Sequence, residues 1–253
     1  MIGKFAQAFC LLGANLPLFG LIILTLWLPA NIAIEASLIE VPAERAEGVS
    51  FRLNQLIGGA FGPIVLGALI FAIAGRMRGE RVGYFEAMAV GFRHWGRMFA
   101  ARFFANFRIL LGLIALIIPG IVLGVRYSLL EPAIIMERPS DAGRRSTDLT
   151  LGRRWPIFFA LAIALAFDYA CGLATRYAFQ QTEALDNFWA YVAADCLLDV
   201  VESLSTVILV LFYLEARQQE AEDAEGREGH LQVDPGSWDL DGPAVAFPGE
   251  FAR

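Results

Sequence analysis

The chain has 253 residues, of which 57% are hydrophobic and 18% are charged, and its mean hydropathy is +0.55. About a quarter of the residues in a soluble domain are charged, so this composition excludes an ordinary soluble domain and favours the bilayer as solvent. The formal charge is −6, but residues 215–253 hold ten of the 26 acidic residues and three of the 20 basic residues. The preceding 214 residues therefore carry 17 basic and 16 acidic groups, a net charge of +1.

At the N-terminus, Lys4 precedes a long apolar run. Small residues at Ala30, Ala33 and Ala36 imitate the cleavage site of a signal peptide. The apolar run is longer than a typical signal-peptide core, so we predict an uncleaved membrane anchor.

Six apolar runs are each long enough to cross a hydrocarbon layer of roughly 30 Å, which takes about 20 helical residues. They lie near 14–36, 55–75, 99–118, 120–137, 156–178 and 190–214. Pro119 and Gly120 separate the third run from the fourth and predict a tight turn, with one long kinked helix as the alternative. The pattern predicts an all-α fold, an integral membrane bundle of about six transmembrane helices.

Two basic segments precede the third and fifth runs and have an amphipathic pattern. In the first, apolar residues at spacings of 3, 4, 3 and 4 form one stripe, with Arg93, His94 and Arg97 off it: Phe85, Met88, Phe92, Trp95 and Phe99. This pattern is typical of an interfacial helix whose arginines bind anionic headgroups. The predicted headgroup-facing residues are Arg93, Arg97, Arg144, Arg145, Arg153 and Arg154.

The second segment repeats the theme of the first. Ser140 is its predicted N-cap, and Trp155 and Phe159 match the interval between Trp95 and Phe99. The N-terminal MIGKFAQAF is a possible third copy, which would make three units of interfacial helix plus transmembrane hairpin. The alternative is ordinary anchoring by tryptophan and arginine at the membrane surface.

The distribution of arginine predicts the orientation. Segments 76–97 and 138–154 hold five arginines each, whereas segments 37–54 and 179–189 hold two and none. Basic loops remain in the cytoplasm, so we expect a multi-pass protein of the cell (inner) membrane with both termini cytoplasmic.

The last apolar run contains three acidic residues. At 100° per residue, Asp195, Asp199, Glu202 and Thr206 fall within an arc of about 60°, and the opposite face is apolar: Leu197, Val201 and Leu204. A charge at the bilayer centre costs roughly 2.5–3.5 kcal/mol on insertion scales, so the polar stripe should face the bundle interior.

Other spans supply possible partners for these acids. Counted by depth, Arg108 lies level with Asp168 and Glu202, and Arg126 lies nearer Asp195 and Asp199; we expect Arg102 to snorkel to the cytoplasmic face. The predicted intramembrane polar cluster is Arg108, Arg126, Asp168, Arg176, Asp195, Asp199 and Glu202. Two interpretations remain open: arginine–acid pairs that fix helix register, or a polar cavity that handles a proton, an ion or a lipid headgroup.

Residues 1–217 thus form the predicted membrane domain, and residues 218–253 form an acidic cytoplasmic tail. The tail is rich in glycine, proline and acids, and we expect it to be disordered. Its aromatic residues, Trp238, Phe247 and Phe251, indicate a possible docking motif for a protein partner, although a solvated tail with incidental aromatics explains them as well.

Residues scattered between 118 and 217 carry a likeness to a known bacterial family. They are Ile118, Pro119, Gly120, Ile121, Arg126, Tyr127, Ser128, Pro132, Ala142, Ser146, Leu149, Thr150, Gly152, Trp155, Phe158, Tyr213 and Arg217. About a fifth of the chain closely resembles the membrane domain attached to some glycerophosphoryl diester phosphodiesterases. The resemblance implies a helical bundle without established activity, because catalysis in those proteins belongs to a separate barrel of roughly 250 residues, for which this chain has no room.

No catalytic motif stands out in the sequence. Cys10, Cys171 and Cys196 lack metal-ligand spacing, and His94 and His230 cannot form a paired-histidine centre. The glycine-rich QLIGGAFG near 56–62 indicates close helix packing rather than a phosphate loop. We therefore expect neither an enzyme nor a bound metal or cofactor.

The arginine-rich amphipathic segments favour a non-catalytic membrane protein that binds or organises lipid. The alternative is a small transporter or channel component that uses the intramembrane acids and arginines. The expected partners are membrane lipids; without a basic patch on a soluble domain, nucleic acid is not expected.

Overall fold

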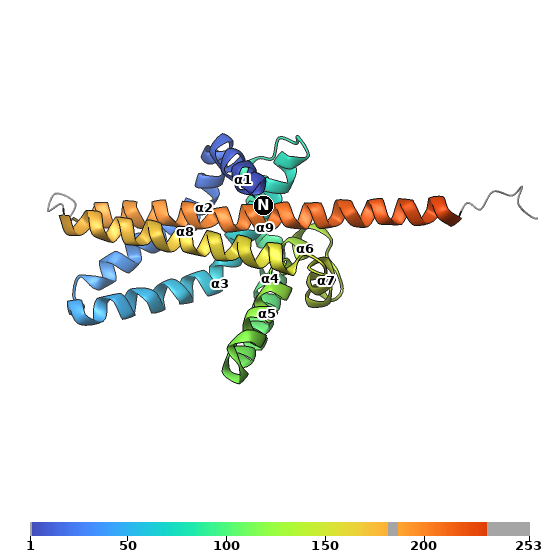
Figure 1. Ribbon diagram of the computed structural model, residues 1–253. Helices are drawn as coiled ribbons and strands as arrows, with labels where there is room; N and C mark the ends of the chain where they lie inside the picture. Colours follow the sequence, from blue (N-terminus) through green and yellow to red (C-terminus); the bar gives the residue numbers. More distant parts are fainter. Residues whose placement is uncertain (1, 182–186, 232–253) are drawn as a thin grey trace, which may run out of the picture. The chain divides into compact units, whose positions relative to one another are not determined.

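The computed structural model of the protein describes residues 2–181 and 187–231, and within them every regular element is helical (Figure 1). The helices are α1 (Ile2–Ala14), α2 (Leu16–Leu38), α3 (Ala43–Met77), α4 (Tyr84–Ala115), α5 (Ile117–Tyr127), α6 (Leu130–Met136), α7 (Ala142–Leu149), α8 (Arg154–Gln181) and α9 (Phe188–Leu231). The chain divides after Ala216 into two units, and all that follows on packing concerns the first.

Six helical segments in the described ranges are long and apolar enough to cross a membrane. They are Leu16–Leu38, Glu44–Met77, Tyr84–Ala115, Ile117–Met136, Arg154–Phe179 and Phe188–Ala224. Each predicted span overlaps one of these segments, which confirms the all-α membrane bundle. The architecture is that of a multi-pass membrane protein.

Prolines in the first turn of a helix determine where several helices begin. Pro17, Pro119, Pro132 and Pro156 are the second or third residues of α2, α5, α6 and α8. In the first turn the missing N–H of proline is not needed, whereas the ring clashes with the carbonyl four residues earlier and favours a break there. Chain breaks therefore precede these prolines by a few residues. Pro29 and Pro63 do not have this effect, because they lie inside α2 and α3.

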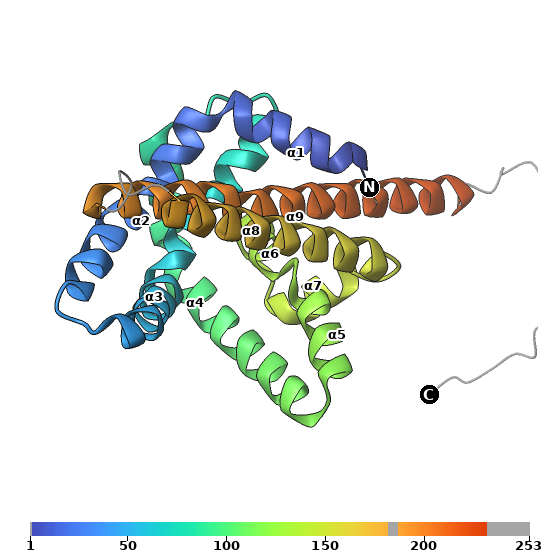
Figure 2. The same cartoon turned by 60° about the vertical axis from the view of Figure 1, so that its left-hand side comes forward.

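The turn between the third and fourth spans follows this rule. The break lies at Leu116, with φ −163° and ψ 141°, three residues before the predicted site at Pro119. Figure 2 shows α4 and α5 running back along each other as a hairpin, so the turn is correct and the single kinked helix is wrong. The hairpin is tight because Gly112 and Gly120 face each other: a Cβ on Gly112 would lie 3.1 Å from the Gly120 Cα.

The fourth span is itself broken at Ser128 and Leu129, between α5 and α6. The buried hydroxyl of Ser146, in α7, bridges the break. It accepts a hydrogen bond from the Leu129 N–H at 3.2 Å and donates to the Arg126 carbonyl at 2.7 Å. Helix α7 therefore replaces backbone partners that a continuous helix would have supplied.

Helix α4 differs from the predicted separate interfacial helix. It runs without interruption from Tyr84 to Ala115, because no proline lies between the amphipathic segment and the third span. Its first half packs on α3: the Trp95 indole N–H donates to the Ala60 carbonyl at 2.7 Å. His94, expected off the apolar stripe, is buried with Nδ1 2.9 Å from the Val90 carbonyl oxygen.

The crossing of α3 and α4 depends on two glycines. A Cβ on Gly91 would lie 2.2 Å from the Ile64 carbonyl oxygen and 3.1 Å from the Ala68 nitrogen. A Cβ on Gly67 would lie 3.2 Å from the Gly91 Cα. The two backbones therefore approach as closely as glycine allows, as small residues permit between membrane helices.

The repeated tryptophan–phenylalanine interval forms the same local contact twice. The ring centroids of Trp95 and Phe99 are 6.1 Å apart, and those of Trp155 and Phe159 are 5.9 Å apart. The predicted N-cap of the second segment is off by one residue. Asp141, not Ser140, caps α7 by accepting from the Arg144 N–H at 3.0 Å.

Helix α1, the possible third copy, is joined to α9 through Lys4. The ammonium group pairs with Glu215 and lies 3.7 Å from the centre of the Phe212 ring. Burial, and secondarily the charge of Arg153, lowers the pKa of Lys4 to about 8.

The predicted disordered tail begins too early. Helix α9 continues to Leu231, so residues 218–231 are helical, since their glutamate, glutamine and alanine residues are good helix formers. Ion pairing within one helical turn adds support: Arg217 donates to Glu220 at 3.0 Å. The aromatic residues of the predicted docking motif, Trp238, Phe247 and Phe251, lie outside the described residues.

Candidate functional site

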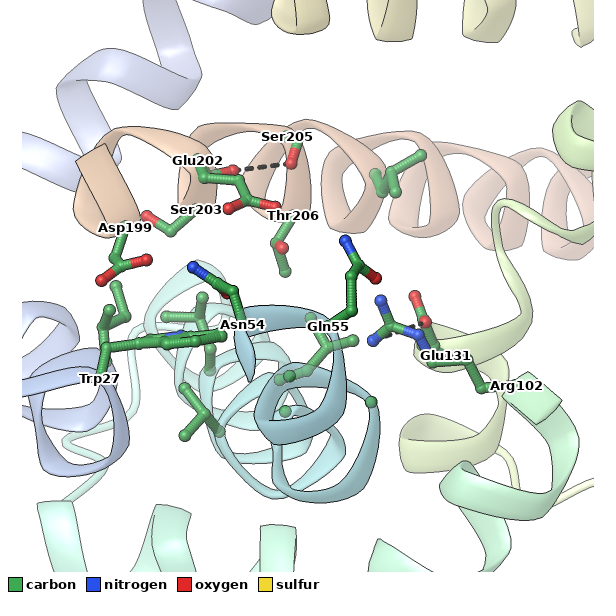
Figure 3. Close-up of a pocket in the computed structure, with 18 of the residues that line it drawn as sticks. Trp27, Asn54, Gln55, Arg102, Glu131, Asp199, Glu202, Ser203, Ser205 and Thr206 are labelled. Carbon is green, nitrogen blue, oxygen red and sulfur yellow. Dashed lines mark hydrogen bonds and ion pairs between the residues drawn. The ribbon is translucent and has the colours of Figure 1, made fainter. Parts of the chain in front are cut away.

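The polar stripe of α9 faces two adjoining cavities. The larger, here the Arg102 cavity, has a volume of about 420 Å³. Its polar lining comes from α3, α4, α6 and α9, with Trp27 from α2: Asn54, Gln55, Arg102, Asn106, Glu131, Asp199, Glu202, Ser203, Ser205 and Thr206. Figure 3 shows the α9 side chains opposite Trp27, Asn54 and Gln55, with Arg102 and Glu131 close together to one side.

The second, here the Asp168 cavity, has a volume of about 330 Å³. Its polar lining is Asn31, Ser50, Asn54, Asp168, Asp195, Asp199 and Glu202. Asn54, Asp199 and Glu202 line both cavities. All four predicted acids of the intramembrane cluster therefore line one or both of these adjoining cavities.

Asn31 holds Asp199 in place. This asparagine is buried in α2, and its side-chain amide donates to Asp199 Oδ2 at 2.8 Å. The same amide nitrogen lies 3.7 Å from the Cys196 sulfur. The pairing fixes the orientation of Asp199, whose carboxylate also lines both cavities.

Arg102 departs from the prediction. It was expected to snorkel to the cytoplasmic face, but its guanidinium lies in the cavity, 3.6 Å from Glu131 Oε1. Because α4 is continuous through this region, Arg102 lies well inside the helix rather than at its end. Glu131, at the start of α6, offsets the charge of Arg102.

The charges around the cavities are unequal. The described lining residues include five acids, Glu131, Asp168, Asp195, Asp199 and Glu202, and one arginine, Arg102. Unless the carboxyl groups are protonated, this region is strongly negative. Ionisable residues that face a cavity inside a membrane commonly mark a substrate or ion pathway, so we treat this region as the candidate functional site.

The predicted partners of these acids lie elsewhere. Neither Arg108 nor Arg126 is among the described residues that line the cavities. Equal depth along the helices did not predict which side chains are neighbours, because α4 and α5 form a separate hairpin. Arg108 Nη1 would lie 3.9 Å from a Cβ on Gly143, near α7. Arg176 pairs instead with Glu47 at 2.9 Å, both side chains being exposed.

Only part of the predicted apolar face of α9 is exposed on the surface of the helix bundle. Leu197 is exposed, as expected for a lipid-facing side chain, but Leu204 is buried in the core and Val201 lines the Asp168 cavity. Helix α9 packs against neighbours on more than one side, so a two-faced description is too simple.

The glycine-rich segment of α3 serves both packing and the cavity. Gly58 packs closely, because a Cβ there would lie 3.1 Å from the Trp27 ring. Gly59 and Gly62 line the Arg102 cavity, and a Cβ on either would meet open space. Close packing thus explains Gly58, whereas Gly59 and Gly62 leave space that belongs to the Arg102 cavity.

The predicted headgroup-facing arginines fall into two groups. Arg93, Arg97 and Arg144 are exposed. The others are partly buried: Arg145 donates to Glu137 at 2.5 and 3.1 Å, Arg153 donates to the Leu149 carbonyl at 3.4 Å, and Arg154 has a buried Nε without a hydrogen-bond partner in the described structure.

Sequence reasoning missed Asn31, Asn54, Asn106 and Glu131, all of which lie near or in the cavities. The signal that identified the α9 acids, a polar residue in an apolar run, applies to Asn31, Asn106 and Glu131 as well; Asn54 lies just before the predicted run 55–75. Among the described residues, no group of three or more histidine, cysteine, aspartate or glutamate side chains is arranged to hold a metal ion.

Comparisons with known proteins leave the family of this chain open. A scan against protein-family models, a search of curated proteins and a search of solved structures each return no match.

Proposed function

We propose that the protein is a non-catalytic, multi-pass protein of the cell membrane that binds a small cationic solute inside the bilayer and moves it across, as a transporter or channel component. The observation that carries this proposal is the gathering of five acids and one arginine around two adjoining cavities. The asymmetry of arginine between alternate loops supports an orientation with both termini cytoplasmic.

A cationic solute follows from the energetics of the site. Burying unpaired carboxylates in a membrane is unfavourable, and a cation between them offsets part of that cost. Asp199 and Glu202 line both cavities, so a cation passing from one to the other would remain beside them. The carboxylates would thus act as binding groups rather than as catalysts.

The test is flux in proteoliposomes. We expect the double variant Asp199→Asn, Glu202→Gln to reduce the uptake of protons, Na⁺ or tetramethylammonium at least about tenfold, the equivalent of 1.4 kcal/mol. Asp148→Asn, which changes an exposed acid of α7, should retain full flux. A double variant with the same flux as the unchanged protein would rule out the role of these acids.

A specific observation also favours lipid binding as a second function. At the start of α4, Phe85 is 85% exposed and Phe92 is 62% exposed, and the exposed Arg93 and Arg97 lie beside them. Exposed aromatic side chains next to arginines suit the interface with anionic headgroups. The likeness to the phosphodiesterase membrane domain is consistent with either function and stays a prediction.

The lipid proposal predicts a preference for anionic lipid. Arg93→Gln and Arg97→Gln should each weaken the binding of phosphatidylglycerol to the detergent-solubilised protein about fivefold, since a basic residue near an anionic surface contributes about 1 kcal/mol. Binding of phosphatidylcholine should not change, and Arg176→Gln is the matched control. Lipid titration followed by native mass spectrometry measures these affinities; equal binding of both lipids to the unchanged protein would contradict the electrostatic part.

A further inference from the structure

We propose that the occupant of the Arg102 cavity is an organic ammonium ion, with its cationic nitrogen near Asp199 and Glu202 and its carbon groups against Trp27 and the neighbouring apolar wall. This inference rests on the proposed binding of a cation and names its chemical class.

The Arg102 cavity has both acidic and apolar walls. Its acids are Glu131, Asp199 and Glu202, and the last two also line the Asp168 cavity. Its apolar wall is made by Ile23, Trp27, Val65, Leu66, Leu69 and Leu209. A solute with a charged end and an apolar body matches this lining, because each part meets a surface of its own kind.

Trp27 is placed to recognise a cation. Figure 3 shows its indole ring extending from α2 toward Asn54, with Asp199 nearby. The ring packs over Gly58, where a Cβ would lie only 3.1 Å from it, so the backbone of α3 supports the ring. Ammonium groups bind to the face of tryptophan through the ring quadrupole, and adjacent carboxylates strengthen the attraction.

The size of the cavity supports the same class. Pockets that enclose small organic ligands have volumes of roughly 300–1,000 Å³, and the Arg102 cavity, at about 420 Å³, lies within this range. Glu131 opposes the charge of Arg102, and Asp199, oriented by the Asn31 amide, lines the cavity together with Glu202. Amide side chains of Asn54 and Gln55 supply carbonyl oxygens for an ammonium group that carries N–H bonds.

The experiment measures binding of benzyltrimethylammonium to the full-length protein in nanodiscs by equilibrium dialysis. We expect Trp27→Leu to weaken binding about two- to thirtyfold, the range of a cation–π contact, and Trp27→Phe to restore part of the loss. Trp189→Leu, which changes an exposed tryptophan of α9, is the matched control. Rescue by phenylalanine distinguishes recognition of the cation from a general loss of folding.

A second variant fills the cavity without changing a charge. Gly59→Leu should abolish binding, since a Cβ at Gly59 meets open space and the longer side chain would occupy the ligand volume. A Cβ on Gly96, in α4, also meets nothing within 4 Å, but Gly96 does not line the cavity. The Gly96→Leu variant should therefore bind benzyltrimethylammonium normally. Normal binding by the Gly59 variant would overturn the placement of the ligand.

Competition separates this inference from the proposed function. Neopentylbenzene, the uncharged analogue, and Na⁺ should both fail to displace the probe at concentrations where unlabelled benzyltrimethylammonium succeeds. If Na⁺ competes equally well and Trp27→Leu has no effect, the organic class is wrong but cation binding stands. If no cation binds to the unchanged protein, both proposals are wrong.

Discussion

Replacing Gly91 by alanine is expected to push α3 and α4 apart and to lower the free energy of unfolding by about 1–3 kcal/mol, the usual cost of overpacking. The added Cβ would lie 2.2 Å from the Ile64 carbonyl oxygen, which belongs to the backbone and cannot rotate away. Relief requires a shift of one whole helix, and that shift would disturb the contacts of Gly67 and Met98 at the same crossing.

The control lies one and a half turns farther along the same helix. A Cβ on Gly96 meets nothing within 4 Å, so Gly96→Ala should stabilise the protein by up to about 1 kcal/mol through helix propensity. Equilibrium unfolding in mixed micelles measures both variants against the unchanged protein. The opposite signs are the expected result; equal effects of the two substitutions would contradict the close crossing.

Replacing Glu137 by glutamine should also destabilise the protein. This carboxylate accepts two hydrogen bonds from Arg145, at 2.5 and 3.1 Å, and one from the Tyr213 hydroxyl at 2.7 Å. It therefore connects the end of α6 to α7 and α9. Breaking a buried ion pair costs about 3–5 kcal/mol, and because the two charged side chains retain 18% and 21% of their exposure, we expect about 2–3 kcal/mol.

Tyr213→Phe tests the other contact of Glu137. It removes one hydrogen bond and keeps the ion pair, so the loss should be about 1 kcal/mol. Thermal unfolding of the solubilised protein compares the two variants. A Glu137→Gln variant no less stable than Tyr213→Phe would show that the ion pair contributes little.

The sequence predicts the membrane spans well because hydrophobic length is a property of each segment alone. Helix ends were less accurate, as at Leu116, because the break favoured by Pro119 lies three residues before that proline. The continuous α4 was missed for a related reason. A change from amphipathic to fully apolar composition indicates a new environment, but it does not by itself end the helix.

The candidate site was half predictable. The common face of Asp195, Asp199 and Glu202 follows from helix geometry, and both cavities lie along it. The partners could not be predicted by depth, because depth ignores which helices are neighbours. Asn31 reaches Asp199, and Glu131 reaches Arg102, through the packing of α2 and α6 in the bundle, and such pairings between distant segments have no local signature.

The interrupted fourth span imposes an order on biogenesis. The amide of Leu129 and the carbonyl of Arg126 are both satisfied by Ser146, a residue that leaves the ribosome later than either of them. Until it arrives, the gap between α5 and α6 must remain hydrated or shielded by the insertion machinery. Lateral release of this span into lipid is therefore expected to wait for the synthesis of α7.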